Sequence, residues 1–221
     1  MYKYYLFDLD HTLFDFNLAE DLSLKNTFLE EGIAFDERLR LDYDTYNKKL
    51  WKDYEALKVT REELLVSRFE KLFEKHGIHL DAKSFNEKYL LSLSKQPLPM
   101  KGAKEVLEAL SQRACIVIAT NGPSETQREK LKSSGLYDYV DFLITSEDAG
   151  ITKPHEGFFT YLFKTCEIKS PKDCIMIGDN PYTDIFGAKQ AGMDTCLFDP
   201  EGKHLEHEAH RRIEILTDIL K

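Results

Sequence analysis

The sequence predicts an α/β fold: a doubly wound parallel sheet of the Rossmann-like type, interrupted by an inserted α-helical segment. Two observations lead to this prediction. Near both ends of the chain, short apolar runs are each followed by polar or glycine-rich residues, and the later runs alternate with helical patterns. Between the two ends, helical spacing dominates from residue 15 to residue 96.

The apolar runs are short and rich in β-branched or aromatic residues, as buried strands are. They lie at Tyr4–Phe7, Cys115–Ala119, Phe142–Ile144, Cys174–Ile177 and Thr195–Phe198. Helices are predicted over 103–110 and 125–134, the latter ended by Gly135, and again from Asn180-Pro181 to Gly192. Strands that alternate with helices favour a parallel sheet covered on both faces.

The inserted segment has apolar and aromatic residues at helical spacing. One such series is Leu39, Tyr43, Tyr46, Leu50 and Tyr54. Thr60 followed by Glu63 predicts a capping box, and Gly32 and Gly77 are predicted helix ends. We therefore expect a core formed by residues 1–14 and 97–221 and a helical cap formed by residues 15–96.

Composition narrows the class of protein. The chain of 221 residues is 42% hydrophobic with a formal net charge of −9, which favours a globular protein and disfavours binding to a nucleic acid polymer. No apolar run could span a bilayer and no signal peptide is evident, so we expect a cytoplasmic protein away from membranes. The four cysteines are expected to be free thiols. His204, His207 and His210 are interpreted as one face of a solvated helix.

Polar residues that could carry chemistry follow the predicted strands. Asp8 and Asp10 follow the first strand, Thr120-Asn121-Gly122 the second, and Asp179 a later one, with Asp184 five residues further on. Lys153-Pro154 precedes a helix. Because the carboxyl ends of the strands in a doubly wound sheet face one crevice, these segments could meet in one site.

The residue types fit one reaction. One carboxylate of the Asp8/Asp10 pair can attack phosphorus while the other handles protons. Aspartate oxygens suit magnesium, and the hydroxyl of Thr120 and the amide of Asn121 can donate to phosphoryl oxygens. Lys153 supplies positive charge where negative charge would accumulate.

The order and type of these residues resemble the haloacid dehalogenase superfamily, in which phosphatases predominate. The first motif reads D-L-D-H-T-L from Asp8, and the last reads G-D-N-P-Y-T-D from Gly178. The resemblance covers about residues 1–14 and 100–200. It implies a cap that closes over a small phosphorylated metabolite and excludes water.

The resemblance also implies a role for each residue. Asp8 would be the nucleophile and a metal ligand. Asp10 would protonate the leaving oxygen and then deprotonate water, and its backbone carbonyl would bind the metal. Thr120, Asn121 and Lys153 would bind the phosphoryl group. Asp179 would bind Mg²⁺, and Asp184 would bind it through water or orient Lys153.

Other activities of the superfamily remain as alternatives. Dehalogenases have no need of a second carboxylate at the position of Asp10, so its presence argues against dehalogenation. Phosphonate hydrolases use a cap lysine as a Schiff base; lysines occur in the cap here, but Asp10 again favours ester hydrolysis. Sugar phosphomutases commonly have valine where Thr12 stands, which is a modest argument for a phosphatase. A catalytically silent binding module would usually have lost one of the carboxylates, and none is missing here.

The closest resemblance is to bacterial pyrimidine 5′-nucleotidases of this superfamily. It rests on the stretch from Asp8 to Phe16, with Phe14-Asp15-Phe16 leading into the cap, and on Ser146-Glu147 before Gly150. It implies a pyrimidine nucleoside monophosphate as substrate. The alternative is a small sugar phosphate or phosphoglycolate. The oligomeric state cannot be predicted from these residues.

Overall fold

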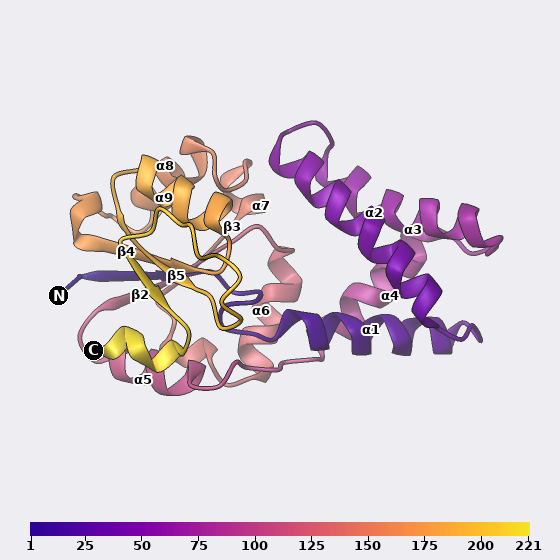
Figure 1. Cartoon of the computed structure of the whole chain (residues 1–221), viewed down its shortest axis with the longest axis horizontal. Coiled ribbons are helices and arrows are strands. Elements are labelled where there is room, and N and C mark those ends of the chain that lie inside the picture. The colour runs from indigo at the N-terminus through magenta and orange to yellow at the C-terminus, as the bar shows by residue number, and fades with distance from the viewer. The chain divides into compact units, whose positions relative to one another are not determined.

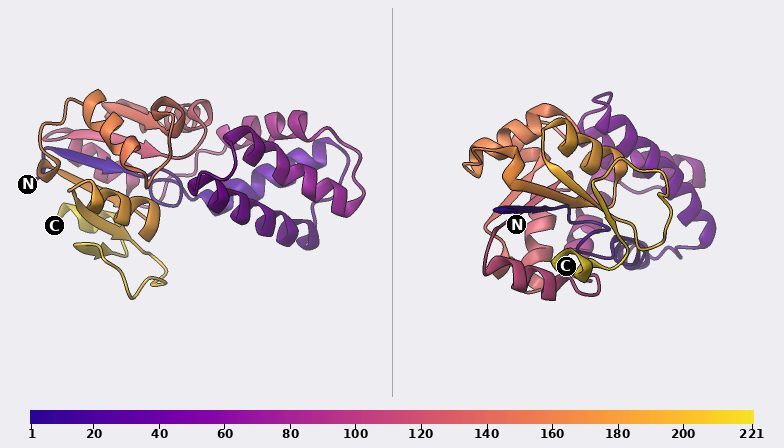
Figure 2. Two further views of the ribbon diagram at one scale, coloured as in Figure 1. Left: turned by 90° about the horizontal axis from the view of Figure 1, so that it is seen from above. Right: turned by 60° about the vertical axis from the view of Figure 1, so that its left-hand side comes forward.

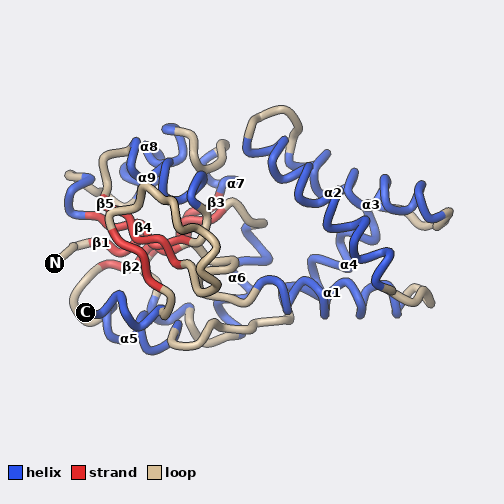
Figure 3. Tube along the Cα trace, in the orientation of Figure 1, coloured by secondary structure: helices blue, strands red, loops and turns tan.

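The computed structural model describes all residues from Met1 to Lys221, which form two compact units (Figure 1). Both ends of the chain, residues 1–17 and 97–221, build the first unit, and residues 18–96 build the second. Strands occur only in the first unit (Figure 3). No helix in either unit combines the length and the apolar character needed to cross a membrane.

The first unit contains one sheet of six parallel strands in the order β3-β2-β1-β4-β5-β6, which Figure 2 shows from two sides. The strands are β1 (Tyr4–Phe7), β2 (Cys115–Thr120), β3 (Phe142–Thr145), β4 (Cys174–Gly178), β5 (Asp194–Phe198) and β6 (Arg211–Ile213). The predicted fold class is confirmed, and five of the six strands lie where the apolar runs predict them.

Alternate residues of the strands pack on opposite faces of the sheet, because side chains in a strand point alternately up and down. On β1, Tyr5 and Phe7 join a hydrophobic cluster with α5 (Ala103–Ser111) and η4 (Leu216–Leu220). Leu6 joins a second cluster with α8 (Glu156–Thr165) and α9 (Gly187–Gln190). The strands are therefore apolar on both faces, as buried parallel strands are.

The helical elements of the first unit connect these strands. They are α5 (Ala103–Ser111), α6 (Ser124–Ser133), η1 (Tyr137–Tyr139), α7 (Ser146–Ala149), α8 (Glu156–Thr165), η2 (Pro171–Asp173), η3 (Pro181–Phe186), α9 (Gly187–Gln190) and η4 (Leu216–Leu220). The helix predicted from Asn180 is present, and the Asn180 side chain accepts hydrogen bonds from the backbone N–H groups of Tyr182 and Thr183. Its first segment, η3, is a π-helix.

The C-terminal region differs from the prediction. Residues 200–210 form no helix, and β6 follows them. Asp199 organises this loop: its carboxylate accepts hydrogen bonds from the backbone N–H groups of Lys203 and His204 and from the side chain of Arg212. The histidine spacing is therefore not that of a helix face.

The four cysteines are free, as expected, and three of them are buried.

The second unit is an assembly of helices. The elements are α1 (Phe16–Glu30), which begins in the first unit, α2 (Glu37–Glu55), α3 (Arg61–His76) and α4 (Ala82–Ser94). The capping box of Thr60 and Glu63 starts α3, and Gly77 ends it in the left-handed conformation. Aromatic rings fill the interior: the ring centroid of Phe85 lies 4.6 Å from that of Phe28 and 4.9 Å from that of Phe69.

A network of buried polar side chains crosses this aromatic interior. The carboxylate of Glu20 accepts hydrogen bonds from Tyr43 at 3.1 Å and Asn47 at 3.2 Å. The Arg68 guanidinium donates to Tyr43, Asn47 and Asn86 at 2.9–3.2 Å. Burial raises the pKa of Glu20, and the positive charges of Arg40 and Arg68 oppose this rise. The network thus keeps a buried charge of each sign compensated.

Replacing Arg68 with methionine is expected to destabilise the helical unit by about 3–5 kcal/mol, because the amide oxygens of Asn47 and Asn86 lose their donor and the buried carboxylate of Glu20 loses a compensating positive charge. Chemical denaturation followed by circular dichroism would measure this loss. Lys71→Met, on the exposed face of the same helix, is the matched control and should change stability by less than about 0.5 kcal/mol. Equal effects of the two substitutions would contradict the role of the network.

Candidate active site

The site is built where the two central strands of the sheet end. β1 lies between β2 and β4, and Asp8 is the first residue after it. The backbone N–H of Asp8 donates to the carbonyl of Ile177 on β4 at 2.9 Å, so the residues that follow both strands are brought together. The chain then turns tightly, with the N–H groups of Leu13 and Phe14 both donating to the carbonyl of Leu9.

Lys153 joins three of the predicted segments. Its ammonium Nζ donates to Oδ1 of Asp8 at 2.7 Å, to Oδ1 of Asp184 at 2.6 Å and to the backbone carbonyl of Ala119 at 2.6 Å. The side chain is only 1% exposed. An ammonium has three protons, so all its donors are used, and its position is fixed by β2 and two carboxylates.

Three carboxylates form one cluster. Oxygen atoms of Asp8, Asp179 and Asp184 all lie within 4.8 Å of one another. Thr12 connects the first motif to the last, because its hydroxyl donates to Oδ1 of Asp179 at 3.2 Å. The structure therefore brings together the two ends of the sequence pattern, since Thr12 and Asp179 lie 167 positions apart along the chain.

Gly178 makes room for the carboxylate of Asp184. A Cβ atom at position 178 would lie 2.2 Å from Oδ2 of Asp184, far inside van der Waals contact. The same Oδ2 accepts a hydrogen bond from the backbone N–H of Asn180 at 3.1 Å. The glycine of the last motif is thus required by the close packing of Asp184 against the backbone of β4.

The electrostatics of the cluster are unbalanced. Burial raises the pKa of Asp8 to about 7, in spite of the nearby charge of Lys153. Burial, together with the charges of Asp8 and Asp184, raises the pKa of Asp179 well above its ordinary value. Burial by itself would lower the pKa of Lys153, but the two carboxylates outweigh it and raise this pKa. Three carboxylates therefore share one ammonium, and further positive charge would stabilise their ionised forms.

Asp10 faces a different set of partners. Its Oδ2 accepts a hydrogen bond from Gln127 at 2.6 Å, and its Oδ1 pairs with the ammonium of Lys130. The Asp10 side chain keeps 24% of its surface exposed. Gln127 and Lys130 were not predicted from the sequence, because the polar composition of α6 resembles a solvated helix. The usable signal was that both residues share a helix face with the apolar Leu131.

The two residues at the end of β2 have separate roles. The hydroxyl oxygen of Thr120 accepts hydrogen bonds from the N–H of Gly122 at 3.0 Å and from Gln127 at 3.1 Å, so its own proton can be donated elsewhere. The side-chain amide of Asn121 bonds both the carbonyl and the N–H of Lys153, at 3.0 and 2.9 Å. This amide therefore holds the backbone of Lys153 with one of its two N–H groups, and its donation to a phosphoryl group stays a prediction.

The two phenylalanines that follow the first motif, Phe14 and Phe16, already pack against other side chains. Phe14 is completely buried and lies under the Lys130 ammonium, 5.0 Å from ring centroid to Nζ. Phe16 is half-buried and packs edge-on against His11, with ring centroids 5.1 Å apart. Phe14 therefore has no free face for stacking against a ligand.

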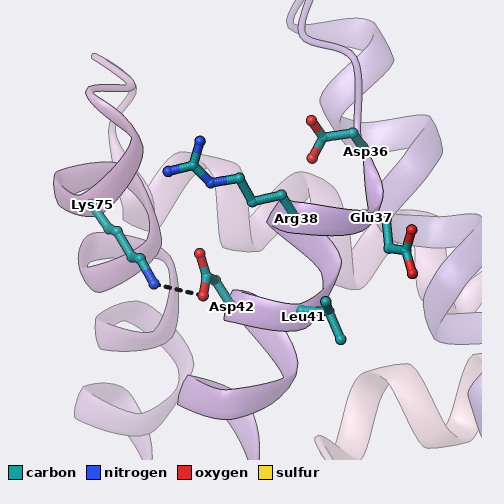
Figure 4. Close-up of a pocket in the computed structure, with 6 residues that line it drawn as sticks. All are labelled: Asp36, Glu37, Arg38, Leu41, Asp42 and Lys75. Carbon is teal, nitrogen blue, oxygen red and sulfur yellow. Dashed lines mark hydrogen bonds and ion pairs between the residues drawn. The ribbon is translucent and has the colours of Figure 1, made fainter.

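A surface pocket of about 510 Å³ lies within the helical unit (Figure 4). It is lined by Asp36, Glu37, Arg38, Leu41, Asp42 and Lys75. Among these residues, the carboxylate of Asp42 already accepts a hydrogen bond from Lys75 at 2.6 Å and contacts the ring of His76 at 2.9 Å. These pairs satisfy the charge of Asp42 without a ligand.

Several known proteins resemble this chain over most of its length. The pyrimidine 5′-nucleotidase PynA of Streptococcus pneumoniae is 37% identical over 207 residues, covering 93% of this chain and 86% of that protein. The pyrimidine 5′-nucleotidase YjjG of Escherichia coli is 34% identical over 190 residues, covering 86% and 83%. A glyceraldehyde 3-phosphate phosphatase of Pyrococcus furiosus is 30% identical over 208 residues, covering 92% and 83%.

A solved structure matches the fold closely. The crystal structure of the HAD-hydrolase YfnB from Bacillus subtilis, bound to magnesium, superposes with a TM-score of 0.93 at 32% identity, covering 99% of this chain and 96% of that one. The family model of the haloacid dehalogenase-like hydrolases matches residues 2–192. Three observations point to one family: the four motifs meet in one site, the strands follow the order described above, and these matches cover most of the chain. The chain is an enzyme that belongs to the haloacid dehalogenase-like hydrolase family.

Proposed function

We propose that the protein is a magnesium-dependent phosphomonoester hydrolase that forms an aspartyl-phosphate on Asp8, and that its substrates are pyrimidine nucleoside 5′-monophosphates. The observation that carries the first part is the contact of one buried ammonium, that of Lys153, with both Asp8 and Asp184. This contact places the proposed nucleophile, Asp8, next to the positive charge of Lys153, which can stabilise a phosphoryl group. It also connects both to the carboxylate cluster, which is suited to binding a cation.

Asp8 is the nucleophile in this proposal. Lys153 binds its Oδ1, which orients the carboxylate and leaves the other oxygen to attack phosphorus. Lys153 and the hydroxyl of Thr120 stabilise the phosphoryl oxygens. Asn121 acts by fixing the backbone of Lys153. As the Asp8 oxygen–phosphorus bond forms, the ester P–O bond breaks.

Asp10 carries the proton in both steps. It donates its proton to the leaving oxygen as the ester bond breaks, and it is then a carboxylate. It next accepts a proton from water while the water oxygen attacks phosphorus and the bond to Asp8 breaks. Free Asp8, protonated Asp10 and inorganic phosphate are the products, so each cycle returns the enzyme to its starting state.

The carboxylate cluster fits Mg²⁺. Its donors are hard oxygen atoms, which Mg²⁺ prefers. Burial and the neighbouring carboxylates raise the pKa values of Asp8 and Asp179, so a bound cation would stabilise their ionised forms. Asp8, Asp179, Asp184 and the backbone carbonyl of Asp10 are the proposed ligands, with Asp184 also holding Lys153. Bound Mg²⁺ would neutralise charge as the phosphate approaches and as the transition state forms.

We expect a chelator to remove activity, Mg²⁺ to restore it, and Ca²⁺ to inhibit, because the larger ion accepts more ligands and a looser geometry at Asp8. Phosphate release with each ion after dialysis against chelator is the measurement. Full activity in excess chelator would contradict the metal requirement.

Metal binding should also stabilise the fold in a pH-dependent way. The folded-state pKa of Asp8 is raised from 3.8 to about 7, so ionisation of Asp8 lowers the stability of the ion-free protein as pH rises through this interval. Mg²⁺ competes with the proton, so the melting temperature should rise more with Mg²⁺ at pH 8 than at pH 5. A Mg²⁺ concentration of 100 times the dissociation constant would raise the free energy of unfolding by about 2.7 kcal/mol.

The choice of leaving group must come from residues other than those described above. Lys153, Thr120 and the carboxylates can all be assigned to the phosphoryl group or a metal, and Phe14 is buried. We assign the selection of substrate to the helical unit, residues 18–96, as a cap. Support for a pyrimidine nucleotide comes from similarity to PynA and YjjG over most of the chain.

A substrate comparison tests this part of the proposal. We expect kcat/KM for UMP, dUMP or dTMP to exceed that for glucose 6-phosphate and phosphoglycolate, since stacking of a base on an aromatic ring contributes about 1–3 kcal/mol. The similarity to a glyceraldehyde 3-phosphate phosphatase supports the second candidate, a small sugar phosphate. A tenfold preference for a sugar phosphate or phosphoglycolate would select that candidate and leave the phosphatase chemistry intact.

A further inference from the structure

Two buried side chains of α6 hold both oxygens of the Asp10 carboxylate. Lys130 donates to Oδ1, and Gln127 donates to Oδ2 at 2.6 Å. Lys130 is completely buried and Gln127 is 1% exposed. The two residues lie three positions apart, so they project from one face of the helix.

These two side chains are themselves fixed on every side. Lys130 also donates to Oε1 of Gln127 at 3.2 Å, and its ammonium lies 5.0 and 5.5 Å from the ring centroids of Phe14 and Phe16. Gln127 donates in addition to the hydroxyl oxygen of Thr120 at 3.1 Å. Neither side chain can turn without breaking several contacts, so Asp10 is held by a rigid support.

Stability alone does not account for this arrangement. Burying an ammonium is unfavourable unless it is paired, and apolar residues often replace a buried ion pair without loss of stability. Here the ammonium pairs with a carboxylate that stays partly exposed, and each carboxylate oxygen retains an acceptor site beyond the bond to α6. The carboxylate is thus fixed in direction while it remains open to a reacting group.

We propose that Gln127 and Lys130 are positioning residues for proton transfer: they hold the Asp10 carboxylate in the orientation from which it protonates the leaving oxygen. The proposal rests on the proposed function of Asp10. Proton transfer requires an approach of about 2.6–3.2 Å between heavy atoms, so a carboxylate that swings freely would spend little time in the reactive position. Neither residue is assigned to the substrate. Both act through Asp10, and Gln127 also supports Thr120 through a hydrogen bond.

Leaving groups of different acidity separate this role from general damage. p-Nitrophenyl phosphate releases a stable phenolate that needs little protonation, whereas dUMP releases an alkoxide that needs a proton. The value of kcat/KM reports the transfer step for both. In Gln127→Leu and Lys130→Met we expect kcat/KM for dUMP to fall about 10- to 100-fold, part of the 100- to 10,000-fold contribution of a general acid. For p-nitrophenyl phosphate, kcat/KM should fall by less than about threefold, because the phenolate needs little protonation as it leaves.

Matched variants complete the test. Lys132→Met makes the same change on the exposed side of α6 and should leave both substrates unaffected. Gly122→Ala disturbs Gln127 without changing a residue of α6, because a Cβ at position 122 would lie 2.0 Å from Nε2 of Gln127. This variant should reproduce the selective loss of kcat/KM for dUMP. In an Asp10→Asn background, Gln127→Leu should cost less than about twofold, because its effect passes through Asp10.

Equal losses for both substrates, no loss for either, or full additivity with Asp10→Asn would overturn the positioning role. Failure of the proposed function has a different signature, because wild-type protein would then release phosphate from neither ester. Should Lys130→Met not fold, Gln127→Leu and Gly122→Ala decide the result, since they introduce no unpaired buried charge.

Discussion

Phosphate release is expected to fall by about 10,000-fold or more when Asp8 is replaced by asparagine, with the fold retained. The amide has nearly the same shape as the carboxylate but cannot act as the nucleophile. Lys153 keeps its contacts with Asp184 and the carbonyl of Ala119, so the surrounding structure retains most of its hydrogen bonds. Turnover of p-nitrophenyl phosphate and dUMP, with melting temperature as the test of folding, measures the effect.

The control is Asp138→Asn, the same change at an exposed position of the first unit, which should be silent. Mass spectrometry must exclude deamidation of the variant back to aspartate. Turnover above a few per cent of wild type in deamidation-free protein would show that Asp8 is not the nucleophile.

Asp10→Asn should slow both phosphoryl transfer and hydrolysis of the phosphorylated enzyme by about 100- to 10,000-fold, because the amide can neither donate the required proton nor accept one from water. Metal binding should persist, since its proposed contact at this position is the backbone carbonyl. Gln127 and Lys130 bind different oxygens of Asp10, so only one of them keeps its acceptor in the amide, and the ion pair is lost. Single-turnover rates with dUMP, and the shift in melting temperature on addition of Mg²⁺, measure the two properties separately.

A change of less than a few-fold in the single-turnover rates would contradict the role of Asp10 in proton transfer. Loss of the Mg²⁺-dependent shift in melting temperature would instead show that the Asp10 side chain contributes to the metal site.

Much of the fold could be predicted because the strands of a buried parallel sheet must be apolar on both faces. Runs such as Tyr4–Phe7 and Cys174–Ile177 therefore stand out from their surroundings. β6 did not, because its three residues include Arg211 and Arg212, and only Ile213 is buried. An edge strand has one neighbour and can expose charged side chains.

The site residues that belong to short sequence motifs could be predicted. Those whose role depends on contacts formed only in the folded protein could not. Asp8, Asp179 and Lys153 occur in distinctive local patterns, and the sheet brings them together. The use of the Asn121 amide could not be predicted, since its partner is a backbone 32 positions along the chain. Lys130 was also missed, because a lysine on a polar helix is usually solvated, and only the fold shows that it is completely buried.

The central position of β1 has a consequence for how the protein folds. Tyr4 pairs with Cys115 on one side and with Cys174 on the other, so β1 finds its partners only after more than a hundred further residues have been synthesised. The helices of residues 18–96 pack mainly against their neighbours in sequence, and local contacts of this kind form quickly. The inserted helices can therefore fold while β1 is still unpaired. Asp8 and Lys153, which are 145 positions apart, meet only afterwards, so catalytic competence is expected to appear late on the folding pathway.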